Sequence, residues 1–178
     1  YDSVTSIRKD KLVLKEVESR LLENEMILDA EVYINLNGSL GAKITQRNPL
    51  GRVAASPDYY IDDRGERMPL SVVYTARVPL VTGVSESNFK KVTPLLRAID
   101  GDPFMKSSVI GLELQQNGNI ELRLRKHNFK VLFGKPEAIA NKFQNFKAFY
   151  KKTKQDNKLS SYKLVNLQFG DQVVATKI

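Results

Sequence analysis

The sequence predicts an α+β fold in which most strands are antiparallel, and three observations lead to this prediction. Several short segments alternate apolar and polar residues, as strands with one buried face do. Two Asn-Gly pairs, at residues 37–38 and 117–118, join such segments as hairpin turns. Three other segments repeat apolar residues at helical spacing. Because helices and strands do not alternate one for one, a parallel α/β arrangement is not expected.

The composition limits the functions that are open to the chain. Its 178 residues include no cysteine, which excludes disulfides, thiolate zinc sites and cysteine nucleophiles. No long apolar run is present, so no membrane-spanning helix is expected within this sequence. The net charge of +8 is compatible with an anionic partner. However, the lysines concentrate in residues 135–158 without an RNA-binding motif, so we favour a solvated basic surface over nucleic-acid binding.

The first fifty residues predict a helix followed by a β-hairpin. Residues 10–24 carry apolar side chains on one helical stripe, and Asp10 is a candidate N-cap. Residues 30–36 alternate in the manner of a strand, and residues 40–44 do so after the Asn-Gly turn. Pro49 ends this unit.

The remaining sequence predicts short strands and two helices. The first helix covers residues 89–100, where Thr93 caps a new first turn at Pro94, and the second opens at Pro136. Strands are expected at residues 53–56, 58–62, 77–84, 110–114, 120–124, 129–133, 162–169 and 172–178.

The segment YYIDDRGERMPLS, residues 59–71, places three carboxylates among arginines. Asp62, Asp63 and Glu66 could bind a hard cation or act in acid–base chemistry, or they could form the polar tip of a hairpin. A calcium loop needs more oxygen ligands at alternating positions, and the interleaved arginines partly neutralise the cluster. Gly65 is suited to a tight turn. We therefore predict a hairpin tip and no metal site.

No group of residues indicates catalysis. His127 is the single histidine, and it lies in a predicted turn between strands. A solvated side chain is typical there, because a general base needs an orienting partner and a pocket. The sequence contains no GxSxG motif, no Gly-rich phosphate loop and no histidine–carboxylate metal spacing. We predict a binding or structural protein, not an enzyme, without catalytic residues, a metal or a cofactor.

Five segments occur in an order that is specific as a set: AEVYINLNGSLGAKITQRNPLGRV, YYIDDRGERMPLS, ARVPLVTGV, NIELRLRKHNFKVLFG and LVNLQFGDQVVATKI. Together they resemble the bacterial cell-division family FtsQ, also called DivIB, in its Bacteroidetes-type form. The resemblance covers nearly the whole chain. It divides the chain into a partial POTRA-like module at residues 1–52 and an FtsQ-type β domain at residues 53–178. The family's first module opens with a further strand and helix, which are not evident here, so the sequence is expected to begin inside that module.

The resemblance implies a non-enzymatic scaffold of the divisome that is needed for septum formation. The full protein would be a bitopic inner-membrane protein with one transmembrane helix outside this sequence, and the present chain would be its periplasmic part. Its partners would be homologues of FtsB and FtsL, with FtsB the more direct partner. No cofactor and no nucleic acid are implied.

The resemblance places the partner site at the last strands and at the end of the preceding helix. A partner segment would add to the exposed sheet edge through backbone hydrogen bonds. Phe169 matches the family's key aromatic position, where the family has tyrosine. It is either an anchor for an apolar partner residue or a core side chain beside Val165 and Leu167. The other candidate partner-binding residues are Gln168, Val173, Val174, Ala175 and Lys177 on the final hairpin, and Lys147 and Lys151 on the helix.

Three alternatives remain open. The helix lysines, which include Lys142 and Lys152, could pair with acidic partner residues or simply form a wet face. A POTRA-containing periplasmic module of an outer-membrane assembly or secretion system would show repeated POTRA units or a following barrel, and the sequence shows neither. A basic nucleic-acid-binding domain would bind DNA with an affinity that falls steeply with salt.

Overall fold

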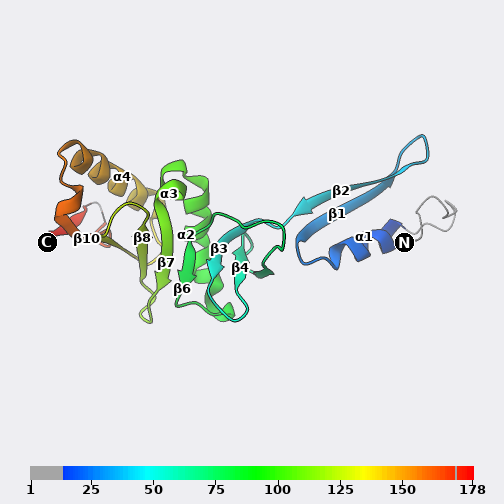
Figure 1. Cartoon of the computed structure of the whole chain (residues 1–178), viewed down its shortest axis with the longest axis horizontal. Coiled ribbons are helices and arrows are strands. Elements are labelled where there is room, and N and C mark those ends of the chain that lie inside the picture. Colours follow the sequence, from blue (N-terminus) through cyan, green and yellow to red (C-terminus); the bar gives the residue numbers. More distant parts are fainter. Residues whose placement is uncertain (1–13, 171) are drawn as a thin grey trace. The chain divides into compact units, whose positions relative to one another are not determined.

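The computed structural model describes residues 14–170 and 172–178, and it confirms the α+β fold (Figure 1). The chain forms two compact units that divide between Arg47 and Asn48. This division lies just before the strand β3 (Pro49–Val53), whereas the sequence-based boundary after residue 52 lies inside that strand.

The first unit contains the predicted helix and hairpin: α1 (Leu14–Leu22), β1 (Ile27–Ile34) and β2 (Leu40–Gln46). The two strands pair antiparallel, and Gly38 in the turn has φ +79°, as an Asn-Gly turn requires. Glu18 in α1 accepts a hydrogen bond from the backbone N–H of Val32 at 2.9 Å. The helix therefore satisfies a backbone donor of β1 that does not point to β2. The proposed N-cap, Asp10, lies outside the described residues.

The second unit is built on one sheet of nine strands, in the order β11-β10-β9-β8-β7-β6-β3-β4-β5. Three neighbouring pairs are parallel, namely β9–β10, β6–β7 and β3–β6, and the other five are antiparallel. The sheet is therefore mixed and mostly antiparallel. Besides β3, its strands are β4 (Tyr59–Asp62), β5 (Arg67–Pro69), β6 (Leu80–Thr82), β7 (Val109–Leu114), β8 (Ile120–Leu124), β9 (Lys130–Gly134), β10 (Tyr162–Asn166) and β11 (Val174–Lys177).

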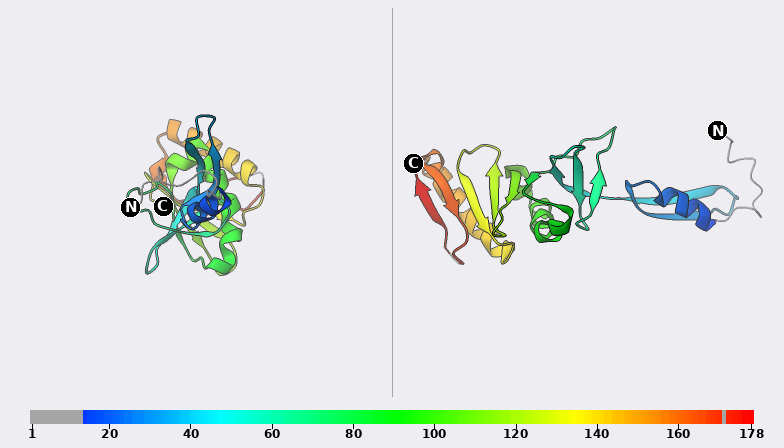
Figure 2. Two further views of the ribbon diagram at one scale, coloured as in Figure 1. Left: turned by 90° about the vertical axis from the view of Figure 1, so that its right-hand side faces the viewer. Right: turned by 90° about the horizontal axis from the view of Figure 1, so that it is seen from below.

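The helices of the second unit gather on one face of this sheet (Figure 2). The two long helices carry their apolar stripes into a single core, where Leu95 of α2 and Phe146 of α4 are fully buried against buried strand residues such as Leu122. A short third helix, α3, follows α2 because Asp102 accepts hydrogen bonds from two backbone N–H groups of its first turn. The helical segments are η3 (Glu86–Asn88), α2 (Phe89–Gly101), α3 (Pro103–Ser108), α4 (Ile139–Gln155) and η4 (Leu159–Ser161).

The segment after β3 corrects the strand predicted at residues 53–56. The strand ends at Val53, and the chain then turns. Asp58 organises this turn, because its carboxylate accepts hydrogen bonds from the backbone N–H of Ala55 and from the guanidinium of Arg52. A side chain that bonds to nearby backbone in this way competes with strand pairing.

The first helix of the second unit begins at Phe89 as predicted, but the new turn expected at Pro94 and the start expected at Pro136 are wrong. Pro94 lies inside α2, which already begins at Phe89, and the Thr93 hydroxyl donates to the carbonyl of Phe89 at 2.8 Å instead of capping a new helix. The last helix begins at Ile139 and not at Pro136, because Ala138 adopts a left-handed conformation with φ +49°. Burial of the apolar stripe outweighs the local signals of proline.

The acidic segment between β4 and β5 is the predicted hairpin tip. Asp62 is fully buried, and its Oδ1 atom accepts hydrogen bonds from the backbone N–H groups of Arg64 at 3.0 Å and Glu66 at 2.8 Å. Gly65 has φ +76°, a conformation that favours glycine. The carboxylate of Asp62 therefore holds the turn that joins two paired strands.

Candidate partner-binding site

The strand β11 forms one end of the nine-stranded sheet. Among the described residues it pairs only with β10, so its other side carries no strand. The N–H of Ile178 donates to the carbonyl of Ser161 at 3.0 Å, which fixes the direction of the backbone groups at this end. Because these directions alternate along a strand, the N–H and C=O groups of Ala175 and Lys177 point to the open side.

The side chains of the final hairpin divide between the core and the solvent. Val173 and Ala175 are partly buried and pack against the core. Val174 is 42% exposed, and Gln168 and Lys177 are also exposed. The hairpin therefore offers an open backbone edge with an apolar side chain beside it, and its neighbouring residues hold the strand to the domain.

Phe169 is 51% exposed, whereas Val165 and Leu167 are buried. Of the two alternatives for Phe169, packing in the core beside these two residues is therefore wrong. The carbonyl of Phe169 accepts a hydrogen bond from the N–H of Gln172, so Phe169 already belongs to the turn, and the strand alternation does not extend to it. Asp171, the other predicted turn residue, lies outside the described residues.

Two contacts hold the segment that leads to this turn. The Asn145 side chain of α4 donates to the carbonyl of Gly170 at 3.3 Å. The side chain of Gln168 lies over Gly134, where a Cβ atom would be only 2.8 Å from Cγ of Gln168. Gly134 also has φ +78°, so two independent reasons favour glycine there. Phe169 thus projects from an anchored turn.

The lysines of α4 are not equivalent. Lys142 is buried and donates to the carbonyls of Phe133 at 3.0 Å and Lys135 at 2.8 Å, and burial lowers its pKa. Lys147 forms an ion pair with Asp102, with an Nζ–Oδ2 distance of 2.7 Å. Lys151 is exposed to solvent. Of the two helix lysines in the predicted site, Lys147 is therefore engaged within the domain, whereas Lys151 is exposed and takes no part in this ion pair.

His127 is not the solvated turn residue that the sequence suggests. It is half-buried, its Nε2 atom lies 2.9 Å from the hydroxyl of Tyr150, and its ring stacks on Phe129 at 5.3 Å. Burial lowers the pKa of His127, and the nearby charge of Lys126 lowers it further. Sequence reasoning missed this cluster because Tyr150 comes from α4, and no local pattern connects it to His127.

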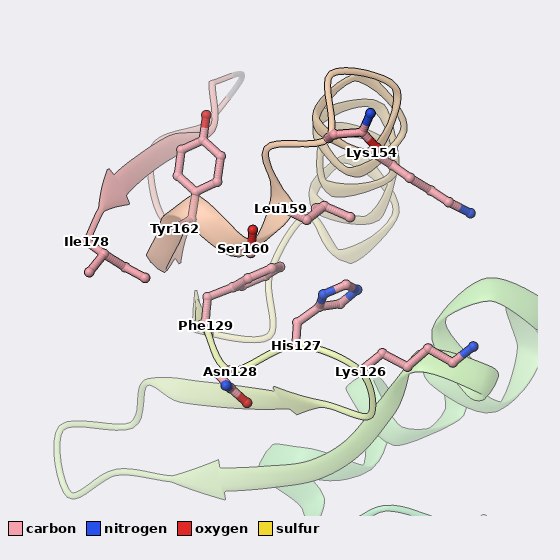
Figure 3. Close-up of a pocket in the computed structure, with 10 residues that line it drawn as sticks. Lys126, His127, Asn128, Phe129, Lys154, Leu159, Ser160, Tyr162 and Ile178 are labelled. Atoms are coloured by element: carbon pink, nitrogen blue, oxygen red, sulfur yellow. The ribbon is translucent and has the colours of Figure 1, made fainter.

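Two hollows lie beside His127. One hollow of about 380 Å³ lies between residues 126–129, the end of α4, the segment from η4 to the start of β10, and Ile178 (Figure 3). A second hollow of about 250 Å³ lies toward α3, and Lys126, His127 and Lys154 line both.

Within residues 14–170 and 172–178, no three or more metal-ligating side chains come together. None of the helices in these ranges is both long enough and apolar enough to cross a membrane.

The sequence matches the family described as "FtsQ/DivIB, C-terminal related" over residues 48–176. The chain belongs to this family. The match coincides with nearly the whole second unit, which carries the nine-stranded sheet and its open edge. FtsQ/DivIB proteins are non-catalytic scaffolds of cell division, so this domain is of the cell-division type. No curated protein sequence matches the chain.

Proposed function

We propose that the chain is the periplasmic part of a divisome scaffold that binds FtsB- and FtsL-type partners by strand addition at β11. The observation that carries the proposal is the open side of β11 in a domain of the FtsQ/DivIB type. Strand addition uses the backbone for affinity and neighbouring side chains for register. An unpaired edge of this kind is a hazard unless a partner occupies it.

The proposal includes the cellular setting. The full protein is anchored in the inner membrane by a single helix outside this sequence, and it acts at the division septum. The first unit, with its helix and hairpin, serves as part of a POTRA-like module. Both statements extend the family membership, which the match over residues 48–176 supports.

The backbone of β11 supplies the main contacts in this proposal. The outward N–H and C=O groups of Ala175 and Lys177 bind the partner strand, and Val174 provides apolar contact beside it. Phe169 anchors an apolar residue of the partner, a role that large exposed aromatic side chains often have at interfaces. Gln168, Val173 and Lys151 flank this site. Lys147 takes part only where a partner carboxylate competes with Asp102.

Amide chemical shifts of the purified chain, titrated with a peptide from the matching FtsB homologue, test the location of the site. The perturbed amides are expected to concentrate at residues 160–178 and at the end of α4. Perturbation that avoids residues 160–178 would show that the edge is not the binding site.

The backbone role of the edge is tested by replacing Lys177 with proline and, as a matched control, with alanine. Lys177→Pro removes an N–H that points to the open side, and edge positions tolerate proline where this group faces solvent. Lys177→Ala removes the side chain and keeps the N–H. We expect the proline variant to bind the FtsB-type partner at least about tenfold more weakly than the alanine variant. Equal affinities would rule out pairing through this group.

The anchor role of Phe169 is tested by Phe169→Ala, with Tyr74→Ala as the control because Tyr74 is also an exposed aromatic residue. Truncation of an interface anchor typically costs about 2 kcal/mol or more, which corresponds to a loss of affinity of about thirtyfold. Tyr74→Ala is expected to leave the affinity unchanged. A Phe169→Ala protein that folds and binds normally would remove Phe169 from the site.

A further inference from the structure

Two adjoining hollows beside His127 together make up a groove. They share Lys126, His127 and Lys154, so they adjoin at these side chains. The first hollow extends from Ile178 to Lys154 at the end of α4 (Figure 3), and Phe104 and Ser107 of α3 line the second. The groove is therefore a feature distinct from the flat outer edge of β11, although the two meet at Ile178.

The groove is positively charged and lacks compensating acids. Arg125, Lys126 and Lys154 line it together with His127, and no aspartate or glutamate lines either hollow. Neither Lys126 nor Lys154 forms an ion pair with any residue in the described ranges 14–170 and 172–178. The position of Lys154 at the end of α4 suits the helix dipole, but that effect does not account for Lys126 in the strand connection.

The walls of the groove are aromatic. Phe129 and Tyr162 line the first hollow, and Phe104 and Tyr150 line the second. The imidazole of His127 lies between them, stacked on Phe129 and hydrogen-bonded to Tyr150. Cations above an aromatic lining favour a ligand that combines carboxylates with an apolar or aromatic group.

We propose that this groove binds an acidic, aromatic-containing segment that continues from the partner strand paired with β11. The position of Ile178 supports the connection, because this residue both ends the open edge and lines the groove. A partner chain that pairs along β11 and passes Ile178 enters the groove directly. The carboxylates then pair with Lys126 and Lys154, and the apolar side chain packs on Phe129. The orientation of the segment rests on the strand addition proposed above, whereas the chemistry of the groove does not.

An acidic peptide fits this groove better than a membrane or a nucleic acid. The hollows are concave, and the cations lie around a small aromatic lining. A lipid surface requires a flat or convex basic face, and a nucleic acid requires cations spaced along a phosphate backbone.

The single histidine provides a specific reporter for the test, because its imidazole resonances need no assignment among other histidines. The probe is a capped Glu-Phe-Glu-Glu tetrapeptide, and the control is Lys-Phe-Lys-Lys of the same length. The acidic probe at millimolar concentration is expected to shift the His127 resonances and to raise the pKa of His127, since a carboxylate beside the imidazole favours its charged form. The side chains that share the hollows with His127, which include Arg125, Lys126, Lys154 and Tyr150, contain no carboxylate.

A pair of charge-reversal variants separates the groove from general electrostatics. Lys126→Glu/Lys154→Glu is expected to abolish the tetrapeptide shifts and to weaken binding of the FtsB-type partner about tenfold. Lys90→Glu/Lys91→Glu changes the net charge by the same amount at two exposed lysines of α2. This control is expected to keep the tetrapeptide shifts of His127 and the affinity for the partner within about twofold of the native values.

The outcomes distinguish this inference from the proposed function. If Lys177→Pro loses partner binding, and if Lys126→Glu/Lys154→Glu binds the partner as well as Lys90→Glu/Lys91→Glu does, the groove is overturned and strand addition stands. Loss in the groove variant and retention in Lys177→Pro supports the groove and overturns pairing at Lys177. If the tetrapeptide has no effect on His127, or if phosphatidylglycerol vesicles or an oligonucleotide produce the shift instead, the acidic-peptide assignment is wrong.

Discussion

The two end strands of the nine-stranded sheet, β5 and β11, differ in how well their open sides are protected against pairing with another strand. β5 has three residues, of which Met68 is only 5% exposed and Pro69 lacks an N–H group. Arg67 pairs with Glu86 at 3.0 Å and lies over the ring of Tyr59 at 4.5 Å. β11 has four residues and no proline, and two of its residues direct backbone groups outward. Short length, charge and proline are common ways to protect an edge, and only β5 combines all three.

This difference agrees with the proposal that a partner strand pairs with the open side of β11. The same protection could have been placed at both ends, since neither Val174 nor Thr176 is needed to fill the core. Instead, the turn before β11 is tied to α4 and exposes Phe169, and the groove beside His127 begins where β11 ends. Four experiments test whether the two end strands differ in this way.

The largest effect is expected from truncating the apolar side chain at each edge. Met68→Ala removes a buried side chain and should lower the free energy of unfolding by about 2–5 kcal/mol. Val174→Ala removes a half-exposed side chain and should cost less than about 1 kcal/mol. Urea unfolding measures both values, provided that the dependence of the unfolding free energy on urea concentration has the same slope in each variant. Similar losses at the two positions would show that the edges are equally integrated into the core.

The second effect concerns partner binding and not stability. Residues 72–74 after β5 are strongly exposed, and Val73 is 91% exposed. Val174→Asp is expected to weaken FtsB-type binding about tenfold, because a desolvated charge opposes the added strand. Val73→Asp should leave the affinity unchanged. Isothermal titration of both variants makes the comparison, and weaker binding in Val73→Asp would place the partner at the β5 end.

The third effect is a pH dependence at the β11 end. The pKa of His127 in the folded protein is below its ordinary value of 6.5, because burial and Lys126 disfavour its charged form. Between pH 6.5 and that lower value, the unfolded chain binds more protons, so stability falls as the pH falls through this window. The native chain should therefore lose stability from pH 7 to pH 5 more steeply than His127→Gln in urea unfolding.

This window is separate from that of Asp58. A hydrogen bond from Arg52 lowers the pKa of Asp58 below 3.8, so the stability that Asp58 contributes is lost only below about pH 4. If His127→Gln and the native chain lose equal stability from pH 7 to pH 5, then His127 is not the cause of the pH dependence of stability.

The smallest effect is expected at the protective ion pair of β5. The side chains of Arg67 and Glu86 are about half exposed, so Arg67→Ala should lower stability by less than about 1 kcal/mol. Partner binding should be unaffected. A double-mutant cycle with Glu86→Ala gives the coupling energy, and a value well above 1 kcal/mol would show that this edge depends on the pair.

Local patterns in the sequence were sufficient to predict much of both units. Both Asn-Gly turns join paired strands, and the apolar stripes of α2 and α4 are buried as their spacing requires. The DDRG segment is a hairpin tip because Asp62 and Gly65 meet local backbone demands. These features depend on neighbours within a few residues, which is why the sequence predicts them.

Other features depend on which strands become neighbours. β6 inserts between β3 and β7 and runs parallel to both, and the sequence, which predicts a mostly antiparallel sheet, does not indicate which pairs are the parallel ones. Gly83 is required there, since a Cβ atom would lie 2.0 Å from the carbonyl oxygen of Leu114, a residue distant in sequence. No local pattern contains this information.

The α+β class, the turn chemistry and the family follow from the sequence alone, because short-range backbone preferences and apolar spacing depend on adjacent residues. The exposure of Phe169, the ion pair of Lys147 with Asp102 and the basic, aromatic surroundings of His127 follow only from the packed structure. Each of these outcomes is a contact between residues far apart in the chain. Burial and charge pairing at such contacts are settled when the sheet and helices pack, and not before.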